Sequence, residues 1–301
     1  MVLKTKTNLL AALTVALTLT ACSSDSDQQT SAREIRLFTE VAGSATRAAD
    51  DADALQDTQL ASGTKITVKV KENASTTSVD YPLATYTADG LGGLSLPEGV
   101  KQYYPANGNG VNIYAFHPMG VGQSFEVQTD QTTDAAYKAS DLMWASLSDV
   151  KADSENHTLD FTHKLSKIVV TLQKGNVDAD LLATATLSIG SDDLVTSGAF
   201  TASTGTFTPA ESGTGTITFA ENAGTTPHAA IVVPQAIAGK KVNLTIGEVT
   251  NSYTILTPSY EPGKKYTYVL TVNYGGELSL IKFDIADWDF MEIEKVIDFN
   301  F

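Results

Sequence analysis

The sequence predicts an all-β protein built from two tandem β-sandwich domains. Three observations lead to this fold class: short runs of β-branched and aromatic residues, turn signals between those runs, and the absence of a long helical period. The clearest run is residues 65–71 (KITVKVK), in which Ile66, Val68 and Val70 share one face while Thr67 and the lysines share the other. Alternation with a period of two residues is typical of a half-buried strand.

The remaining strand candidates come in order along the chain. They are residues 111–116, 124–128, 165–172, 182–189, 215–219, 229–233, 242–246, 253–255 and 266–272. Glycine, proline and asparagine mark turns between them. Residues 134–145 fit either one short helix or an irregular loop. The polar stretch at 148–157 predicts a domain boundary near Asn156, so the sandwiches are expected at residues 48–157 and 158–301.

The first residues predict export from the cell. Lys4 and Lys6 precede an apolar run at 9–20 that is too short for a permanent membrane span, which indicates a signal peptide at residues 1–21. The run ends in Leu-Thr-Ala-Cys, the pattern of a lipoprotein cleavage site, so Cys22 is the predicted lipid anchor to the outer membrane. An ordinary cleavage site with a chance cysteine is the alternative. Cys22 is the only cysteine in the chain, so no intrachain disulfide can support the fold.

One isolated strand candidate follows a small polar tether at 23–31. Residues 34–41 (EIRLFTEV) place Ile35, Leu37, Thr39 and Val41 on one face. The next residues, 42–53, are small, polar and unpatterned, and we expect proteases to reach them. Arg47 is the one basic residue of that stretch.

Charge and motifs exclude several classes of function. The net charge of −15 and the pI near 4.5 repel phosphate backbones, so we expect no nucleic-acid partner. The sequence contains no nucleophile elbow, no phosphate-binding glycine loop and no Cys/His cluster, so we expect no catalytic residue, no cofactor and no metal. His157 and His163 are expected on opposite sides of a strand entry. The acidic residues at 284, 287 and 289 lack the glycine turn of a calcium loop and are expected in a solvated turn.

Several stretches, in their order along the chain, resemble fimbrillin-type pilins, the subunits of lipoprotein-derived fimbriae. They are DLMWA at 141–145, FTHKLSK at 161–167, IVVPQ at 231–235, PGKKY at 262–266 and the late Trp288, together with the lipidation signal, the isolated strand and the arginine after it. The resemblance covers nearly the whole chain. It implies two transthyretin-like, Greek-key sandwiches and a lipidated propeptide at residues 22–47.

The resemblance also implies how such a subunit would assemble. An arginine-specific protease at the cell surface would cut between Arg47 and Ala48, and the subunits would polymerise by strand exchange. An incidental linker arginine is the alternative interpretation of Arg47. Loss of Ile35, Leu37, Thr39 and Val41 would expose a groove with apolar pockets and unpaired backbone groups, and such an edge needs a partner strand.

The C-terminus is the best donor candidate in the sequence. Met291, Ile293, Ile297, Phe299 and Phe301 fall on one two-residue face that only Lys295 interrupts. The alternative is that these residues form the last strand of the second domain.

The sequence thus predicts a structural pilin at the cell surface that contributes to adhesion and biofilm formation, with other fimbrial subunits as its partners. A fimbrial tip adhesin and a surface glycan-binding lipoprotein remain alternatives. Glycan-binding modules usually expose aromatic platforms, whereas Trp144 and Trp288 lie in apolar patterns that predict burial.

Overall fold

A computed structural model describes residues 33–41, 60–74, 81–152, 156–222, 225–273 and 278–288 of the chain. In these residues the chain forms strands in several sheets together with two short helices, so the all-β prediction is confirmed. No helix among them is long and apolar enough to cross a membrane.

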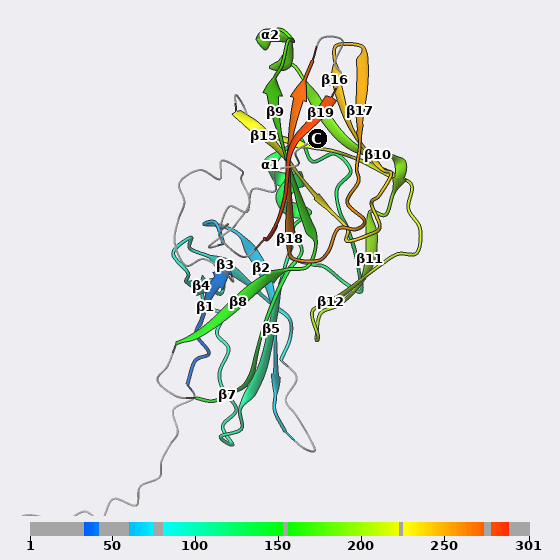
Figure 1. Cartoon of the computed structure of the whole chain (residues 1–301). Helices are drawn as coiled ribbons and strands as arrows, with labels where there is room; N and C mark the ends of the chain where they lie inside the picture. The colour runs from blue at the N-terminus through cyan, green and yellow to red at the C-terminus, as the bar shows by residue number, and fades with distance from the viewer. Residues whose placement is uncertain are drawn as a thin grey trace, which may run out of the picture. The chain divides into compact units, whose positions relative to one another are not determined.

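The first sheet has seven strands in the order β1-β8-β7-β5-β2-β3-β4 (Figure 1). Their bounds are β1 Leu37–Val41, β2 Lys65–Glu72, β3 Ala84–Ala88, β4 Leu94–Ser95, β5 Val111–His117, β7 Met143–Val150 and β8 His157–His163. All pairs are antiparallel except β1 with β8, which is parallel.

The alternation of apolar and polar residues along β2 explains which of its side chains enter the core. Ile66, Val68 and Val70 of β2 are fully buried, as their shared face predicts. Thr67 differs from the prediction, because it is buried although it lies on the face with the lysines. Its Oγ1 accepts a hydrogen bond from the Gly120 amide at 3.2 Å, which satisfies the buried hydroxyl.

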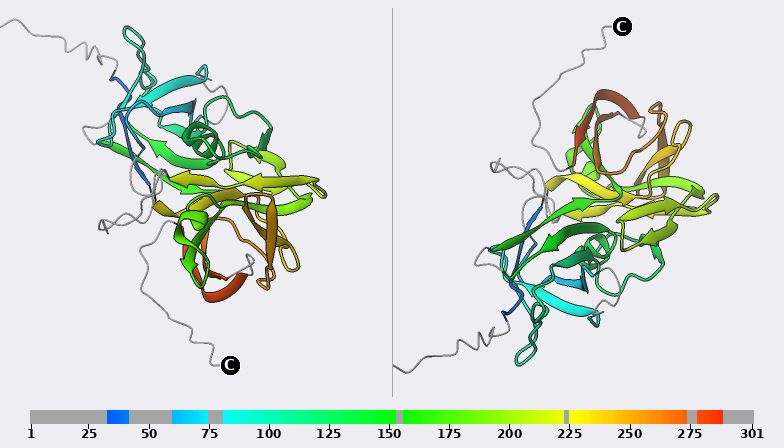
Figure 2. Two further views of the ribbon diagram at one scale, coloured as in Figure 1. Left: turned by 90° about the horizontal axis from the view of Figure 1, so that it is seen from above. Right: turned by 90° about the horizontal axis from the view of Figure 1, so that it is seen from below.

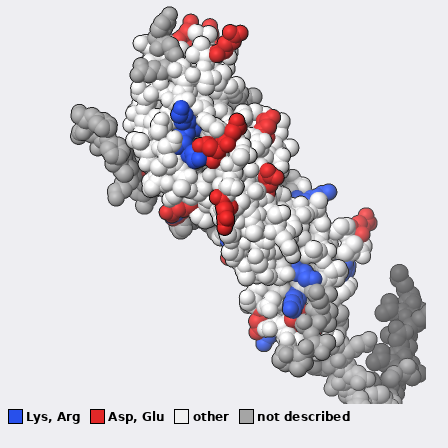
Figure 3. Space-filling view, turned by 90° about the vertical axis from the view of Figure 1, so that its right-hand side faces the viewer, with Lys and Arg blue, Asp and Glu red and all other residues white. Residues whose placement is uncertain are grey.

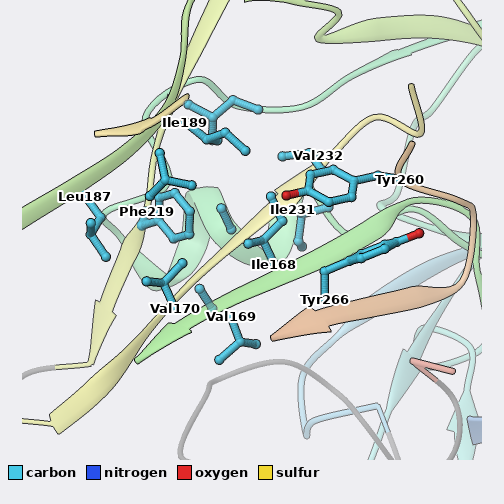
Figure 4. Packing of buried hydrophobic residues seen from close by; sticks show 14 of the residues in the cluster. Ile168, Val169, Val170, Leu187, Ile189, Phe219, Ile231, Val232, Tyr260 and Tyr266 are labelled. Carbon is cyan, nitrogen blue, oxygen red and sulfur yellow. The ribbon is translucent and has the colours of Figure 1, made fainter. Parts of the chain in front are cut away.

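The second core lies between two further sheets. One has the order β14-β15-β9-β18-β19 and the other β13-β10-β16-β17. Their bounds are β9 Ser166–Lys174, β10 Thr186–Leu194, β13 Gly215–Thr218, β14 Ala220–Asn222, β15 Thr225–Val232, β16 Lys241–Ile246, β17 Val249–Thr254, β18 Lys264–Val272 and β19 Leu278–Asp287. Figure 4 shows side chains from both sheets meeting, with Ile168 and Ile231 on one side and Leu187 and Ile189 on the other.

A three-stranded sheet connects the two halves of the sequence. It has the order β12-β11-β6, with bounds β6 Ser124–Glu126, β11 Ser197–Thr201 and β12 Thr206–Pro209. Trp144 also joins the halves, because its indole N–H donates to the Ala202 carbonyl at 2.7 Å. The residue is half-buried, whereas its apolar pattern predicted burial. Trp288 is buried, as predicted.

Two expected elements differ in the structure for local reasons. The strand expected from residue 182 begins at Thr186, because residues 179–182 form the short helix α2 (Ala179–Leu182), whose N-cap Asp178 accepts from the Asp180 amide. The open choice at 134–145 is resolved as the helix α1 (Asp134–Ala139), capped by Thr133, followed by β7.

The strand β8 lies on the other side of the expected boundary. It begins at residue 157 but pairs with β7 and β1, so Leu159 and Phe161 pack in the first core. The first core therefore includes β8, and the two cores are not separated at one point of the sequence, because Phe125 and Leu142 pack in the second core. His157 and His163 both lie within β8, so they are not on opposite sides of a strand entry. Asp284 and Asp287 belong to β19 and not to a turn, and Asp287 forms an ion pair with Lys264.

Candidate functional site

The isolated strand β1 lies at the edge of the first sheet, beside β8. Figures 1 and 2 show β1 in blue next to the green strand β8. The pairing is parallel, with Leu37 opposite His157, Thr39 opposite Leu159 and Val41 opposite Phe161. Among the described strand pairs of the first sheet, only the pair of β1 with β8 is parallel.

The other side of β1 is held by the segment 92–104. The Thr39 amide donates to the Gly92 carbonyl at 2.7 Å, and the Ile35 amide donates to the Gln102 carbonyl at 2.8 Å. The Tyr104 amide donates back to the Arg33 carbonyl at 2.9 Å. Because Gly92 and Gly93 directly precede β4, the last strand of the same sheet, β1 joins the two ends of this sheet. We call the space that β1 occupies, between β8 and residues 92–104, the β1 slot.

Three side chains, Ile35 just before β1 and Leu37 and Thr39 within it, fill this slot. Ile35 is 3 % exposed, Leu37 1 % and Thr39 5 %, and all three alternate with the exposed or half-buried residues between them. Ile35 and Leu37 belong to the first core. Burying two such aliphatic side chains stabilises the closed sheet by roughly 1.5–3 kcal/mol each. The side chain of Val41 lies outside the described residues.

Polar contacts fix the N-terminal end of the segment at the surface. The Arg33 guanidinium donates through Nη1 to the Ala152 carbonyl at 3.0 Å. Lys101 pairs with Glu34 at 3.3 Å across an exposed surface. A surface pair of this kind contributes little to stability, about 0–1 kcal/mol. The pair therefore helps to position the segment and adds little to the free energy of folding.

The fit of β1 is incomplete in two places. The Thr39 Oγ1 is buried, and no residue in the described part of the chain hydrogen-bonds to it. An open surface pocket of about 410 Å³ lies along the strand, and its lining includes Ile35, Leu37, Gly93 and Leu94. On this side the chain forms two β-bridges, Phe38 with Gly93 and Glu34 with Tyr103, and the pocket borders the strand between them.

The remaining predicted site residues lie outside the described residues. These are the lipidation residue Cys22, the processing residues Arg47 and Ala48, and the donor candidates Ile293, Ile297, Phe299 and Phe301. Their roles stay predictions. In the described ranges no group of three or more His, Cys, Asp or Glu side chains could hold a metal ion.

A buried polar cluster brings together three of the stretches on which the family resemblance depends. His163 Nδ1 and Asp141 Oδ1 are 2.7 Å apart, and both side chains are fully buried. The His163 ring stacks on Trp288 with 3.8 Å between ring centroids, and the Lys167 ammonium lies 5.8 Å from the Trp288 ring centroid. Their positions in the sequence did not indicate that they meet. Their common signal is a charged or polar residue within an apolar run.

The surface charge is mixed on the face that Figure 3 shows. Acidic and basic side chains lie there in small groups, without a broad basic area. Among the buried titratable groups, burial lowers the pKa of His228, so this histidine is neutral in the folded protein at pH 7.

The comparisons with known proteins agree with this architecture. The fimbrillin-like family model matches residues 46–288. A candidate cell adhesion protein from Bacteroides uniformis has a similar structure, with a TM-score of 0.65 and 19 % identity over 85 % of this chain and 98 % of that one. Another from Bacteroides ovatus has a TM-score of 0.66 and 16 % identity over 87 % and 99 % of the two chains.

A fimbrial protein from Bacteroides ovatus matches more distantly, with a TM-score of 0.51 and 16 % identity over 81 % of this chain and 49 % of that one. At these identities the solved structures establish the fold alone. No curated protein matches.

The β-sandwich fold and the edge strand that closes its first sheet define the class as an all-β protein. The family match covers most of the chain, and the chain belongs to the fimbrillin-like family. It is therefore a fimbrial subunit or adhesin.

Proposed function

We propose that the chain is a structural subunit of a cell-surface fimbria, exported as a lipoprotein through Cys22 and cleaved after Arg47. Release of β1 then opens the β1 slot, and a strand from a neighbouring subunit fills it. The fibre contributes to adhesion and biofilm formation. The protein is a structural subunit and not an enzyme.

The observation that carries this proposal is the position of β1. It is hydrogen-bonded on both sides, and it joins the two ends of one sheet. Without it, β8 presents a row of unpaired backbone groups, and the pockets of Ile35 and Leu37 face water. An unprotected edge of this kind recruits another strand. The opened subunit therefore binds a partner strand along the edge of β8.

The energy for assembly comes from refilling the same pockets. Each large apolar side chain that enters a pocket contributes roughly 1.5–3 kcal/mol, before the cost of ordering the donor. Backbone hydrogen bonds to β8 add direction and register. The C-terminal residues 291–301, with their alternating apolar side chains, are the donor that we propose.

The arginine content makes the processing step easy to test. The chain has three arginines, and two of them, Arg33 and Arg36, lie in the segment that the β1 slot holds. Arg47 is the third and follows that segment. An arginine-specific protease should therefore cut the folded precursor after Arg47.

The first experiment treats three purified precursors with an arginine-specific protease and follows assembly by electron microscopy. The wild type and the control Arg36→Ala should be cut once and form fibres, because Arg36 is exposed and fills no pocket. Arg47→Ala should stay uncut and monomeric. Normal fibres from Arg47→Ala would contradict the cleavage step.

A second experiment tests the donor. Deletion of residues 296–301 should leave cleavage intact and abolish fibres. Fibres of normal length from the truncated chain would remove the C-terminus from the assembly.

A further inference from the structure

We infer that an open pocket beside the first sheet, lined by tyrosine and proline residues, binds a neutral saccharide. The pocket has a volume of about 670 Å³ and lies between residues 81–85 and 96–106, which form its two walls. Its lining includes Tyr81, Tyr103 and Tyr104, and we call it the tyrosine pocket. The inference goes beyond the proposed function, because the pocket is present in the uncleaved chain and needs neither cleavage nor assembly.

Several apolar side chains that face solvent gather at the tyrosine pocket. Leu83 is 62 % exposed, Val100 49 % and Tyr103 41 %, and all three contribute to the lining. Single exposed apolar side chains are common, but a group of them around one pocket is typical of a binding site. Saccharide-binding modules usually expose aromatic side chains. Tyr103 offers such an exposed ring, whereas Trp288 is buried.

Hydrogen bonds hold the walls of the pocket in place. The Tyr81 hydroxyl donates to the Tyr103 carbonyl at 2.9 Å and so connects one wall to the other. The Lys69 ammonium donates to the Tyr81 carbonyl at 2.5 Å. Gln102, a further lining residue, accepts through Oε1 from the buried Tyr86 hydroxyl at 3.1 Å. The pocket is therefore formed before a ligand arrives, and a preformed site loses less conformational entropy on binding.

The lining matches the chemistry of a saccharide. A sugar ring has apolar C–H faces, which pack on aromatic rings, and hydroxyl groups around its edge, which donate as well as accept hydrogen bonds. The carbonyl oxygens of Tyr81 and Tyr103 accept one bond each in the contacts above, and the second lone pair of each can accept another. The Thr85 hydroxyl is a third polar group of the lining.

Charge favours a neutral saccharide over an acidic one. Among the described residues of the lining, Lys101 alone is charged, and its ammonium lies 3.3 Å from the Glu34 carboxylate. A sialylated or sulfated saccharide would have to compete with Glu34 for this ammonium. The net charge of −15 on the whole chain also repels such anions.

A proline-rich peptide is another ligand that aromatic-lined grooves bind. Such a peptide presents carbonyl oxygens that need donors, and the Tyr81 hydroxyl already donates to the Tyr103 carbonyl. A saccharide hydroxyl supplies its own donor and can bond to a carbonyl oxygen of the lining. The pocket therefore favours a saccharide over a peptide.

The test measures binding of the purified precursor to a saccharide array. The array carries neutral oligosaccharides that end in hexose, N-acetylhexosamine or deoxyhexose residues, the sialylated and sulfated forms of these chains, and a polyproline peptide. We expect binding to at least one neutral chain and weaker binding to its acidic forms. Titration calorimetry with the neutral chain that binds best then gives its dissociation constant for each variant.

Two substitutions of Tyr103 separate an aromatic contact from an apolar one. Tyr103→Phe keeps the ring and should keep the affinity, whereas Tyr103→Leu removes the ring and should weaken binding about 3- to 10-fold. Leu83→Asp places a charge on the other wall and should also weaken binding. Leu91→Ala is the control, because Leu91 is 85 % exposed and does not line the pocket. Urea denaturation identifies the variants that fold as the wild type does.

The outcomes decide the inference independently of the proposed function. Neutral binding that Tyr103→Phe and Leu91→Ala keep and that Tyr103→Leu weakens supports a saccharide in the tyrosine pocket. The inference is overturned if no neutral chain binds, if the acidic chains or the polyproline peptide bind more tightly, or if Tyr103→Leu and Leu83→Asp leave the affinity unchanged. Because the precursor stays uncleaved in this assay, none of these results bears on cleavage or on fibre formation.

Discussion

Because the Thr39 hydroxyl is buried and unpaired, we expect its removal to stabilise the precursor, whereas most substitutions of buried residues destabilise a protein. Thr39→Val removes the buried Oγ1 and keeps the branched shape of the side chain. Leaving a buried donor or acceptor unsatisfied costs about 1–3 kcal/mol, and this cost disappears in the variant. Because Thr39 is 5 % exposed, little solvation is lost. We expect β1 to be held more tightly, although the substitution adds no polar contact.

The magnitude follows from that cost. A gain of about 1–3 kcal/mol lowers the equilibrium constant for release of β1 about 5- to 150-fold. The precursor should unfold at a higher urea concentration, and the cleaved chain should retain the peptide longer and form fibres more slowly. Urea denaturation of the precursor and size-exclusion chromatography of the cleaved chain measure the two effects.

Thr67→Val is the matched control in the same sheet. Thr67 is buried to a similar degree, but its Oγ1 accepts from the Gly120 amide at 3.2 Å. Its replacement should destabilise the precursor, because a hydrogen bond of this kind contributes about 0.5–1.5 kcal/mol. If Thr39→Val destabilised the precursor as Thr67→Val does, the hydroxyl of Thr39 would have a partner and our interpretation of the slot would be wrong.

Three further predictions follow from single contacts. Leu37→Ala should destabilise the precursor by about 2–5 kcal/mol through the cavity it creates, and an unchanged urea midpoint would show that β1 is not part of the core. His163→Leu should cost about 3–5 kcal/mol because it leaves Asp141 buried and unpaired, and the double variant with Asp141→Leu should recover part of this loss in the same denaturation assay. Burial lowers the pKa of His228, so the unfolded chain binds its proton more readily. Stability that this residue contributes is full above about pH 6.5 and is lost as the pH falls through its folded pKa. His228→Leu should flatten that part of the curve, and an identical pH profile would refute the assignment.

Strands with strict alternation were predictable, and their sheet neighbours were not. Residues 65–71 predicted β2 because apolar and polar residues alternate there with a period of two, which matches the geometry of a strand and not that of a helix. The pairing of β8 with β1 could not be predicted, because the two strands are far apart in the sequence and a local pattern carries no information about its partner. For the same reason the sequence placed Leu159 in the second domain, whereas the sheet places it in the first core.

The candidate site was predictable in its pattern but not in its geometry. The alternation of Ile35, Leu37 and Thr39 indicated one buried face, and the structure buries these three side chains. The missing partner of the Thr39 hydroxyl depends on every neighbour in three dimensions, so no sequence pattern indicates it. The contact of Asp141, His163 and Trp288 is similar, because the three residues come from distant parts of the chain and converge only in the folded protein.

A slot of this kind must hold its strand in the precursor and yet release it after processing. Cleavage after Arg47 would change no contact of β1, because the bond that breaks lies beyond the strand. It would remove only the covalent connection that returns β1 to its own slot each time it leaves. Exchange then depends on whether a competing strand binds better than a free β1. In the proposed mechanism a perfectly fitted β1 would stay in place after cleavage, whereas the unpaired Thr39 hydroxyl would weaken β1 and favour a better-fitting donor. The proposed mechanism therefore predicts that removing the unpaired hydroxyl slows assembly while it stabilises the precursor.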